Sequence, residues 1–391
     1  FKAVRVTSLF EAGYARHWLW AEDSNMSSLR TMLRRAMSIS GNRGFSTKLS
    51  DYDFHVPPEL IAQTPAEPRD SARLLVVRRS EGTIEHRVFR ELPDILSPSH
   101  LVVLNNTRVV NCKLSVTCSG SKPATIYLLK GLPGTSWEVS GDEAFEALPA
   151  GTRLQVDGTD ITGTVLTGAS SGTAAVSFES AAATDPNTLR SAIQSAARVP
   201  LPPYITATEG EAGYQTVYAR EGGSVAAPTA GLHFTDRVLA AMDARGIGRA
   251  ELTLHVGYGT FGHVSAEDLG GHSMHSEEFD VPVGAAEAVN AHRAAGKTVL
   301  AVGTTSTRVL ESVTGPDGRV QAGAGATDIF IRPGHRFQTV GALLTNLHMP
   351  RLTPVMLVAA FAGYDLTMAA YREAVEQRYR FFSFGDSMLV L

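Results

Sequence analysis

The chain has 391 residues, of which 43% are hydrophobic and 19% charged, and its formal net charge is −4 at pH 7. This length accommodates two domains with a substantial core, and the composition is ordinary for a soluble globular protein. No apolar run reaches the roughly 18 residues of a membrane-spanning helix, and any RNA contact would need a local basic patch. The two cysteines, Cys112 and Cys118, are too few for a disulfide framework and favour a reducing compartment.

Residues 1–50 differ in composition from the rest of the chain. Between Met26 and Lys48 there are four arginines, several serines and no acidic residue. This composition is typical of an organellar transit peptide, and the alternative is that translation starts nearer Met37. In either case we expect a disordered or targeting extension over residues 1–50.

The first half of the globular part is predicted to be rich in strands. It begins at Asp51 with a short helix over residues 57–62, since proline suits the first turn of a helix. Short β-favouring runs separated by Gly, Ser and Asp turns are typical of a small barrel or sandwich. The predicted strands are 74–77, 83–89, 101–104, 124–129, 153–156 and 163–166, and residues 180–198 favour a helix.

The second half alternates helices and strands. Thr235 is the expected N-cap of a helix that stops at Gly246. At Gly303 a strand meets a Gly/Thr turn and then a helix, and the free N–H groups at such a helix start suit an anion. The other predicted strands are 250–256, 298–302, 328–331 and 388–391; the other helices are 285–295, one beginning at Thr353 and ending before Gly363, and a last one with Met368, Tyr371, Val375, Tyr379 and Phe382 on one face.

The order of these elements predicts the fold class. We expect a mixed α/β (α+β) main domain over residues 51–71 and 183–391. A small antiparallel β-barrel domain is expected as an insertion over residues 72–182.

Two turns that contain glycine and histidine, Pro228–His233 and His255–Phe261, each adjoin a regular element. Glycine lets the backbone approach a ligand, and a rigid scaffold fixes the polar side chains, so these turns indicate a site. Gly257-Tyr258-Gly259 lacks the third glycine of the dinucleotide fingerprint, and the turn at Gly303 lacks the lysine of a P-loop. ATP hydrolysis is therefore not expected.

Four histidines lie beside turns: His233, His255, His275 and His348. None has the spacing to another ligand type that zinc sites show, so we expect no metal. His275 lies close to Glu277 and Glu278, which would allow a general base oriented by a carboxylate. A polar surface loop is the equal alternative.

The C-terminal third is locally basic, and in Tyr379-Arg380-Phe381-Phe382 an arginine lies among aromatic residues. Such a pattern suits base stacking and phosphate contact. For Arg372 and Arg378 a solvated helix face is the preferred interpretation, and the aromatic stripe is expected in the core. The residues thus indicate an α/β enzyme with a nucleoside-like ligand, and they do not name the reaction.

At these same motifs the chain closely resembles the S-adenosylmethionine:tRNA ribosyltransferase-isomerase family of queuosine biosynthesis. The resemblance runs from about Asp51 to Leu391 and is weakest between Cys112 and Ala197. The matching stretches are Tyr52–Phe54, Pro57–Gln63, Ala227–Thr235, Thr253–Gly257, Met274–Glu277, Ala301–Ser306, Thr327–Ile331 and Tyr379–Ser383.

The resemblance implies a mixed α/β domain with an inserted β-barrel and a transfer reaction. The ribosyl part of S-adenosylmethionine is transferred to 7-aminomethyl-7-deazaguanine at the tRNA wobble position and isomerised. Epoxyqueuosine forms, and adenine and methionine leave. No metal or redox cofactor is implied, because S-adenosylmethionine is a consumed substrate.

This reaction needs a base beside the sulfonium, for which His275 or His233 could serve with Glu277 as orienter. It also needs hydrogen-bond donors or an acid near the leaving adenine, for which His255, His348 or Asp386 are candidates. The predicted S-adenosylmethionine contacts are Thr229, Gly231, Gly257, Gly259, Thr260, Gly303, Thr304, Thr305 and His348. The predicted tRNA contacts are Arg69, Asn105, Arg108, Arg332, Arg336 and Arg380.

The sequence departs from the family pattern at three places. The family's Asn-Asp-Thr-Arg reads Asn105-Asn106-Thr107-Arg108, a basic stretch after Trp137 reads Ser140-Gly141-Asp142-Glu143, and Gly-Thr-Phe-Arg-Pro reads Gly259–His263. Anions in place of cations should weaken phosphate attraction. An RNA-binding paralogue without turnover is therefore one alternative. A S-adenosylmethionine-dependent RNA methyltransferase is the other, although its glycine-rich turn after the first strand is missing.

The expected partners are S-adenosylmethionine and a tRNA with a GUN anticodon. We expect a monomer that does not bind a membrane. The expected location is the cytoplasm, or the mitochondrion or plastid if residues 26–48 are a transit peptide.

Overall fold

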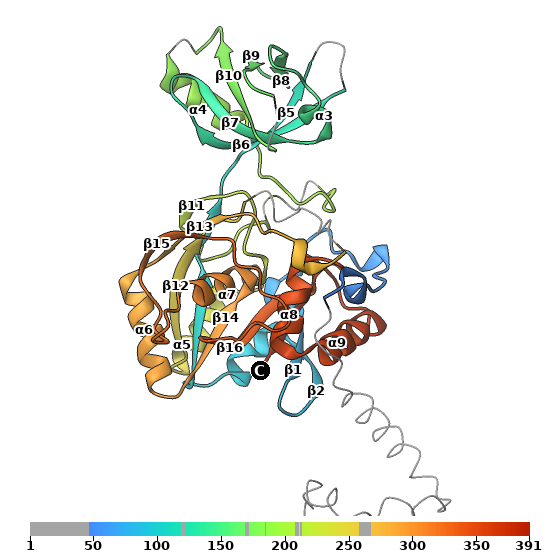
Figure 1. Ribbon diagram of the computed structural model, residues 1–391, viewed down its shortest axis with the longest axis vertical. Helices are drawn as coiled ribbons and strands as arrows, with labels where there is room; N and C mark the ends of the chain where they lie inside the picture. The colour runs from blue at the N-terminus through green and yellow to red at the C-terminus, as the bar shows by residue number, and fades with distance from the viewer. Residues whose placement is uncertain are drawn as a thin grey trace, which may run out of the picture. The chain divides into compact units, whose positions relative to one another are not determined.

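The computed structural model describes residues 47–118, 122–168, 172–183, 185–207, 211, 213–257 and 267–391 (Figure 1). The expectations for residues 1–46, and for Gly259 and Thr260, lie outside the described residues. The predicted extension does not continue to residue 50. Leu49 buries its side chain in the main core and donates its N–H to the Glu267 carbonyl, so this leucine already belongs to the fold.

A nine-stranded mixed sheet forms the main domain, in the order β15-β13-β12-β3-β14-β16-β17-β1-β2. Its four central strands, β12, β3, β14 and β16, are mutually parallel. The pairs β15-β13, β13-β12, β16-β17 and β1-β2 are antiparallel, and β17 pairs with β1 in parallel. The strands are β1 Arg73–Arg78, β2 Thr83–Val88, β3 His100–Asn105, β12 Gly248–Leu254, β13 Glu277–Val281, β14 Thr298–Val302, β15 Gly323–Thr327, β16 Val340–Asn346 and β17 Ser387–Val390.

Helices cover both faces of this sheet, which explains why β3, β14 and β16 are largely apolar. In β14, for example, Val299 and Ala301 belong to one core cluster and Leu300 and Val302 to the other, because successive side chains point to opposite faces. The first cluster includes residues of α6 Val283–Ala294, α7 Gly303–Ser312, α8 Thr353–Ala362 and α9 Tyr364–Glu376; the second includes residues of α2 Leu92–Ile95 and α5 Asp236–Ala244.

Six strands close into an antiparallel barrel in the order β10-β7-β6-β5-β8-β9 (Figure 1). The barrel has its own core, into which Phe145 and Phe178 point, and it is accompanied by α3 Glu143–Glu146 and α4 Pro186–Ala196. Its strands are β5 Lys113–Thr117, β6 Ala124–Gly131, β7 Ser136–Gly141, β8 Arg153–Val156, β9 Ile161–Val165 and β10 Ala174–Ser180. The fold class predicted from the sequence is therefore confirmed.

The boundary of the insertion differs from the prediction. The barrel strands begin at Lys113 rather than near residue 72, because β1, β2 and β3 pair within the nine-stranded sheet. Between the large sheet and the barrel the chain forms β4 Thr107–Val109. This strand pairs with β11 Glu221–Ser224 in a separate two-stranded sheet.

Three predicted elements are wrong in detail. Residues 328–331 are not a strand; the preceding, glycine-rich β15 takes the edge position beside β13. The turn predicted at Gly303 is already the first turn of α7. The last helix ends at Glu376, because Arg378 adopts a left-handed φ of 54° and Tyr379 donates its N–H to the Ala374 carbonyl, a helix-terminating pattern.

No single helix within the described residues is long and apolar enough to cross a membrane; α8 and α9 reach that length and composition only together, across a 120° bend.

Thr235 caps α5 as predicted and also joins it to a buried carboxylate. Its hydroxyl accepts the Val238 N–H (3.3 Å) and donates to Asp70 Oδ2 (2.7 Å). We expect Thr235→Ala to lower the free energy of unfolding by about 1–2 kcal/mol, since an N-cap contact and a buried hydrogen bond are both lost. Urea denaturation measures this, and Thr235→Ser, which keeps the hydroxyl, should recover most of the loss. A Thr235→Ala protein as stable as the wild type would contradict the assignment.

Candidate active site at the carboxyl ends of the parallel strands

The larger of two adjoining cavities has a volume of about 400 Å³ and lies where the central parallel strands end. The segments that follow β12 and β14, together with the end of β16, supply Val256, Gly303 and Asn346 to its wall. Ligands of open α/β sheets bind outside the carboxyl ends of their strands, so this position is the one expected for a substrate.

Aromatic and small residues dominate the lining of this cavity. Tyr204, Tyr214 and Phe382 face it, and the loop Ala226–Ala230 forms another part of its wall. Tyr204 packs on Phe382 with ring centroids 4.9 Å apart. Planar rings beside small residues suit a flat heterocycle such as a purine.

Phe382 has a strained backbone that the surrounding hydrogen bonds hold in place. Its φ is 72°, a left-handed conformation that is unusual for a bulky residue. Its N–H donates to the Leu347 carbonyl, and its carbonyl accepts from Asn346 Nδ2 (3.0 Å) and the Gly385 N–H. Strain of this kind concentrates at functional sites, and Phe382 also lines the larger cavity, so we add it to the candidate site residues.

His348 lines the larger cavity as a neutral imidazole. Its Nε2 lies 2.6 Å from Thr345 Oγ1, and burial lowers its pKa to about 3. At neutral pH it can orient a ligand by hydrogen bonding, but it holds no proton to deliver as imidazolium.

The smaller cavity, of about 100 Å³, adjoins the larger one and shares Thr304, Thr305, Leu352 and Pro354 with it. The shared residues, which we call the neck, come from the starts of α7 and α8. Beyond the neck the lining includes the apolar residues Ile329 to Ile331. It also includes the polar side chains of His272, His275, Glu277 and Arg308.

A buried ion pair joins Glu277 of β13 to Arg308 of α7 in this smaller cavity. Glu277 Oε2 accepts from Arg308 Nη1, and Oε1 accepts the Gly257 N–H (3.1 Å). Arg308 also donates from Nε to the Ile329 carbonyl (3.1 Å) and from Nη2 to the Thr327 carbonyl (3.2 Å). Glu277 therefore joins Arg308 to the backbone of Gly257. Arg308 is a site residue that the sequence did not single out.

Several residues predicted as substrate contacts or catalytic groups meet at these two cavities. The larger one is lined by Thr229, Gly303, Thr304, Thr305 and His348, and the smaller one by Thr304, Thr305, His275 and Glu277. Gly231 is buried beside Tyr218, where a Cβ atom would lie 2.0 Å from the phenol oxygen, so packing explains this glycine. Gly257 contributes its N–H to Glu277.

His233 and His255 lie outside the described lining of both cavities. His233 is buried against Phe89, with ring centroids 5.1 Å apart, and its Nε2 is 3.4 Å from Asn346 Nδ2. Burial, and secondarily the charges of Arg380 and Arg69, lowers its pKa to about 3. His255 places Nδ1 2.8 Å from Thr107 Oγ1, next to β4. His233 thus contacts Asn346 of the cavity wall, and His255 contacts β4.

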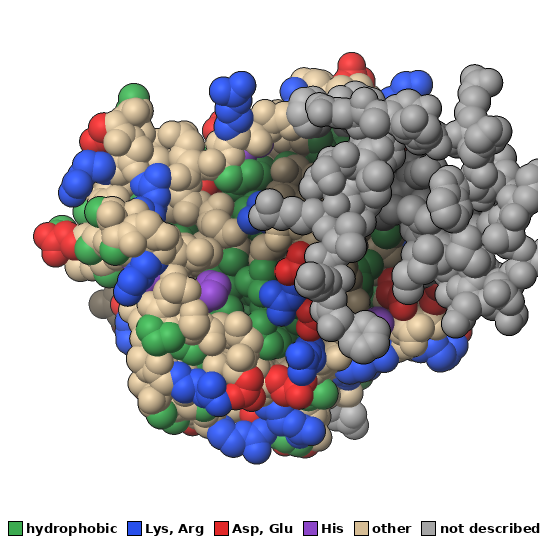
Figure 2. All heavy atoms as spheres, turned by 90° about the horizontal axis from the view of Figure 1, so that it is seen from below, with side chains coloured by type: hydrophobic (Ala, Val, Ile, Leu, Met, Phe, Trp, Pro, Cys, Tyr) green, Lys and Arg blue, Asp and Glu red, His purple; other side chains and the backbone are tan. Residues whose placement is uncertain are grey.

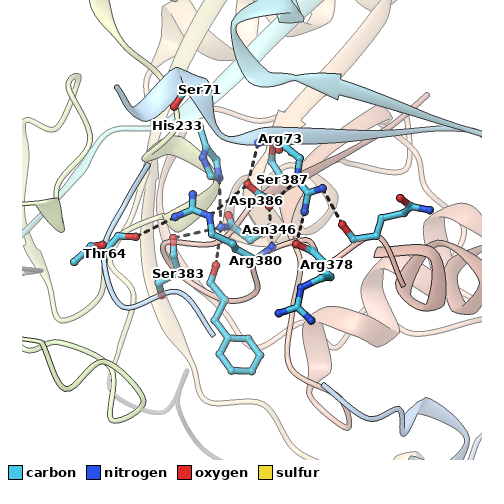
Figure 3. Close-up of polar contacts among 12 residues, drawn as sticks. Thr64, Ser71, Arg73, His233, Asn346, Arg378, Arg380, Ser383, Asp386 and Ser387 are labelled. Carbon is cyan, nitrogen blue, oxygen red and sulfur yellow. Dashed lines mark hydrogen bonds and ion pairs between the residues drawn. The ribbon is translucent and has the colours of Figure 1, made fainter. Parts of the chain in front are cut away.

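Asp386 lies outside the described lining of both cavities and contacts two arginines (Figure 3). Oδ1 accepts the Arg73 N–H (2.9 Å) and Oδ2 the Arg380 N–H (2.8 Å). The guanidinium groups of the same two arginines approach it to 3.5 and 3.7 Å. The carboxylate is thus occupied in joining β1 to the segment before β17.

The predicted tRNA contacts differ in how far they are exposed. Asn105 is 1% exposed and bonds to both the N–H and the carbonyl of Leu254 and to Thr305 Oγ1, so it fixes strand ends. Arg69 donates to the carbonyls of Gln215 (2.6 Å) and Gly213 (3.0 Å). Arg108 and Arg336 are exposed, and Arg332 and Arg380 are partly exposed, so all four are accessible to a phosphate group. On the face drawn in Figure 2, basic and acidic side chains are interspersed.

The two buried histidines predict how stability depends on pH. Their folded-state pKa of about 3 lies below the usual 6.5, so between these values the unfolded chain binds more protons. Stability should therefore fall as the pH drops below about 6.5, by up to about 1.4 kcal/mol per pH unit for each histidine. Urea denaturation at pH 7.5, 6.5 and 5.5 measures the slope. Against the wild type, His233→Gln should show a shallower slope, and equal slopes would contradict the assignment.

Comparison with known proteins agrees with this geometry. A family model described as "Queuosine biosynthesis protein" matches residues 49–390. The chain belongs to this family. The S-adenosylmethionine:tRNA ribosyltransferase-isomerase of Symbiobacterium thermophilum is 48% identical over 350 residues, covering 88% of this chain and all of that protein. Its counterpart from Anaeromyxobacter sp. (strain Fw109-5) is 46% identical, with 88% and 99% covered.

A solved structure extends the comparison to three dimensions. The crystal structure of an S-adenosylmethionine tRNA ribosyltransferase from Thermotoga maritima shares 34% identity with this chain at a TM-score of 0.50. The match covers 87% of this chain and all of that one. The family predicted from the sequence is therefore confirmed.

At two of the positions where the sequence departs from the family pattern, Asn106 and Asp142, the side chains form hydrogen bonds with neighbouring residues. Asn106 accepts from Thr253 Oγ1 (2.7 Å) and donates to Glu251 Oε2 (3.3 Å), a contact that an aspartate could not donate. Asp142 caps α3 by accepting the Phe145 N–H (3.0 Å). Both residues satisfy neighbouring polar groups of this chain, and Gly259–His263 lies outside the described residues.

Proposed function

We propose that this protein is an S-adenosylmethionine:tRNA ribosyltransferase-isomerase. In this reaction the ribosyl part of S-adenosylmethionine is transferred to 7-aminomethyl-7-deazaguanine at the tRNA wobble position and isomerised to epoxyqueuosine. Adenine and methionine are released. The observation that carries the proposal is the pair of joined cavities at the carboxyl ends of the parallel strands, in a chain that belongs to the queuosine biosynthesis family throughout its globular part.

The two cavities suit the donor and the first chemical step. The aromatic larger cavity would hold the adenosyl part, with His348 and Thr345 as hydrogen-bonding groups for the adenine. The neck would then hold the sulfonium, whose positive charge acidifies the adjacent C–H. His275 is exposed and lines the smaller cavity, so it can reach the neck as the general base.

The acceptor must be presented with its base turned out of the anticodon stack, as other base-modifying enzymes require. We propose a tRNA with a GUN anticodon as the partner. Arg108, Arg332, Arg336 and Arg380 remain the candidate phosphate contacts. A monomer in a reducing compartment, the cytoplasm or an organelle, is part of the same proposal, as is the absence of any cofactor.

A single incubation tests the function. The chain beginning at Ser46 is mixed with S-adenosylmethionine and a tRNA that carries the aminomethyl-deazaguanine, and adenine, methionine and the mass of the modified nucleoside are followed. Release of both products with the mass of the epoxycyclopentane-bearing nucleoside is expected. S-adenosylhomocysteine as the product would identify a methyltransferase instead. Ligand binding without turnover would identify an RNA-binding paralogue, in which case Asn106→Asp would be the first reversion to make.

A further inference from the structure

The smaller cavity presents one cation and one anion side by side, and both are nearly buried. The Arg308 and Glu277 side chains are 9% and 5% exposed. Arg308 is the one arginine or lysine, and Glu277 the one acidic residue, among the described residues that line either cavity of the site. A charged ligand group that enters here therefore meets these two side chains.

Stability alone does not account for this pair. A buried ion pair seldom stabilises a fold more than apolar residues of the same volume would. This one also faces a cavity instead of packed side chains. Arg308 has five N–H donors, and its described hydrogen bonds use three, one each to Glu277, Thr327 and Ile329. Two N–H donors remain for an anionic ligand.

We propose that Arg308 and Glu277 bind the α-carboxylate and the α-ammonium of the methionine part of S-adenosylmethionine. This inference rests on the proposed function and specifies how its donor is held. A free amino acid carries a carboxylate and an ammonium on one carbon, and an adjacent guanidinium and carboxylate are the complementary arrangement. The adenosyl part then occupies the aromatic cavity, and the methionine arm passes the neck between them.

The start of α7 supports this orientation of the donor. Thr304 and Thr305 lie in the first turn of α7 and form part of the neck, and Arg308 lies one turn further along the same helix. The positive end of a helix favours an anion in its vicinity. The carboxylate is therefore attracted by the helix start and by the guanidinium together.

Three ligands that share the adenosyl part test the inference by calorimetric titration. S-adenosylmethionine carries both charged groups of the amino acid and decarboxylated S-adenosylmethionine lacks the carboxylate. 5′-Methylthioadenosine lacks the whole amino acid arm and, with it, the sulfonium charge, so each variant is compared with the wild type, ligand by ligand. The wild type should bind the decarboxylated compound about 10- to 100-fold more weakly than S-adenosylmethionine, the loss expected for a hydrogen-bonded ionic contact.

Two variants assign the groups separately. Arg308→Met should weaken the binding of S-adenosylmethionine about 10- to 100-fold and leave the affinities for the other two ligands unchanged. Glu277→Gln, which is nearly isosteric, should weaken the binding of both ammonium-bearing ligands and leave the affinity for 5′-methylthioadenosine unchanged. The matched control is Glu311→Gln. Glu311 is a buried carboxylate of α7, the helix that carries Arg308, and it lies outside the described lining of both cavities. It accepts from the N–H groups of residues 338–340. The Glu311→Gln variant should keep the wild-type order of affinities.

The outcomes separate this inference from the function on which it rests. If the wild type binds S-adenosylmethionine but Glu277→Gln shifts all three ligands equally or none, the inference is overturned and the function stands. If Arg308→Met loses 5′-methylthioadenosine as well, it has misfolded, and Glu277→Gln decides. A wild type that binds none of the ligands and releases no adenine with tRNA would overturn the function itself.

Discussion

His275→Ala is expected to lower the single-turnover rate of adenine release by about 10²- to 10⁴-fold, the range that a positioned general base contributes. The residue lies in the smaller cavity with Thr304 and Thr305, beside the position proposed for the sulfonium. Because the base acts on a bound substrate, the affinity for S-adenosylmethionine should change little. Rapid-quench measurement with enzyme in excess over tRNA reports this rate.

The control for this prediction is His292→Ala. His292 lies on α6 outside both cavities, where its Nε2 is 3.1 Å from the Ser99 carbonyl. This variant should keep the wild-type rate. A His275→Ala protein with the wild-type rate would remove His275 from the reaction, and the base would then have to be sought elsewhere on the neck.

Asp386→Ala is expected to lower the free energy of unfolding by about 2–5 kcal/mol, because two backbone N–H groups lose a buried acceptor. Those groups belong to Arg73 and Arg380, whose guanidinium groups also lose their common counter-ion (Figure 3). Urea denaturation followed by circular dichroism measures the change.

Asp243→Ala is the matched control, since its ion pair with Arg249 is exposed and should contribute less than about 1 kcal/mol. An Asp386→Ala protein with wild-type stability and no adenine release would contradict the structural role of Asp386. It would then support the catalytic role expected from the sequence.

Local features of the fold could be predicted because they depend on neighbouring residues. Thr235 as an N-cap and the strand 298–302 follow from side-chain chemistry and from an uninterrupted apolar run. The boundary of the barrel could not be predicted. A strand such as β1 has the same alternating or apolar pattern whether it pairs with the barrel or with the large sheet. Only the strand pairing shows to which of the two it belongs.

The candidate site was predictable where its residues stand in glycine-rich or histidine-bearing turns. Thr304, Thr305, His275 and His348 were found in this way. Arg308 was missed because its partner, Glu277, lies 31 positions earlier in the sequence. The contacts of Asp386 could not be predicted for the same reason: Arg73, which it binds, is 313 positions away. Contacts over such separations leave no periodic signal in a single sequence.

The central claim is that S-adenosylmethionine binds, and is consumed, in the two cavities joined at the neck. Thr304→Trp tests it most directly, since an indole at this partly exposed position would obstruct both cavities without entering the core. Ser312→Trp, at the exposed far end of α7, is the control. We predict that Thr304→Trp abolishes both S-adenosylmethionine binding and adenine release at an unchanged melting temperature, and that Ser312→Trp retains both. Wild-type binding by Thr304→Trp would place the donor elsewhere and contradict the account.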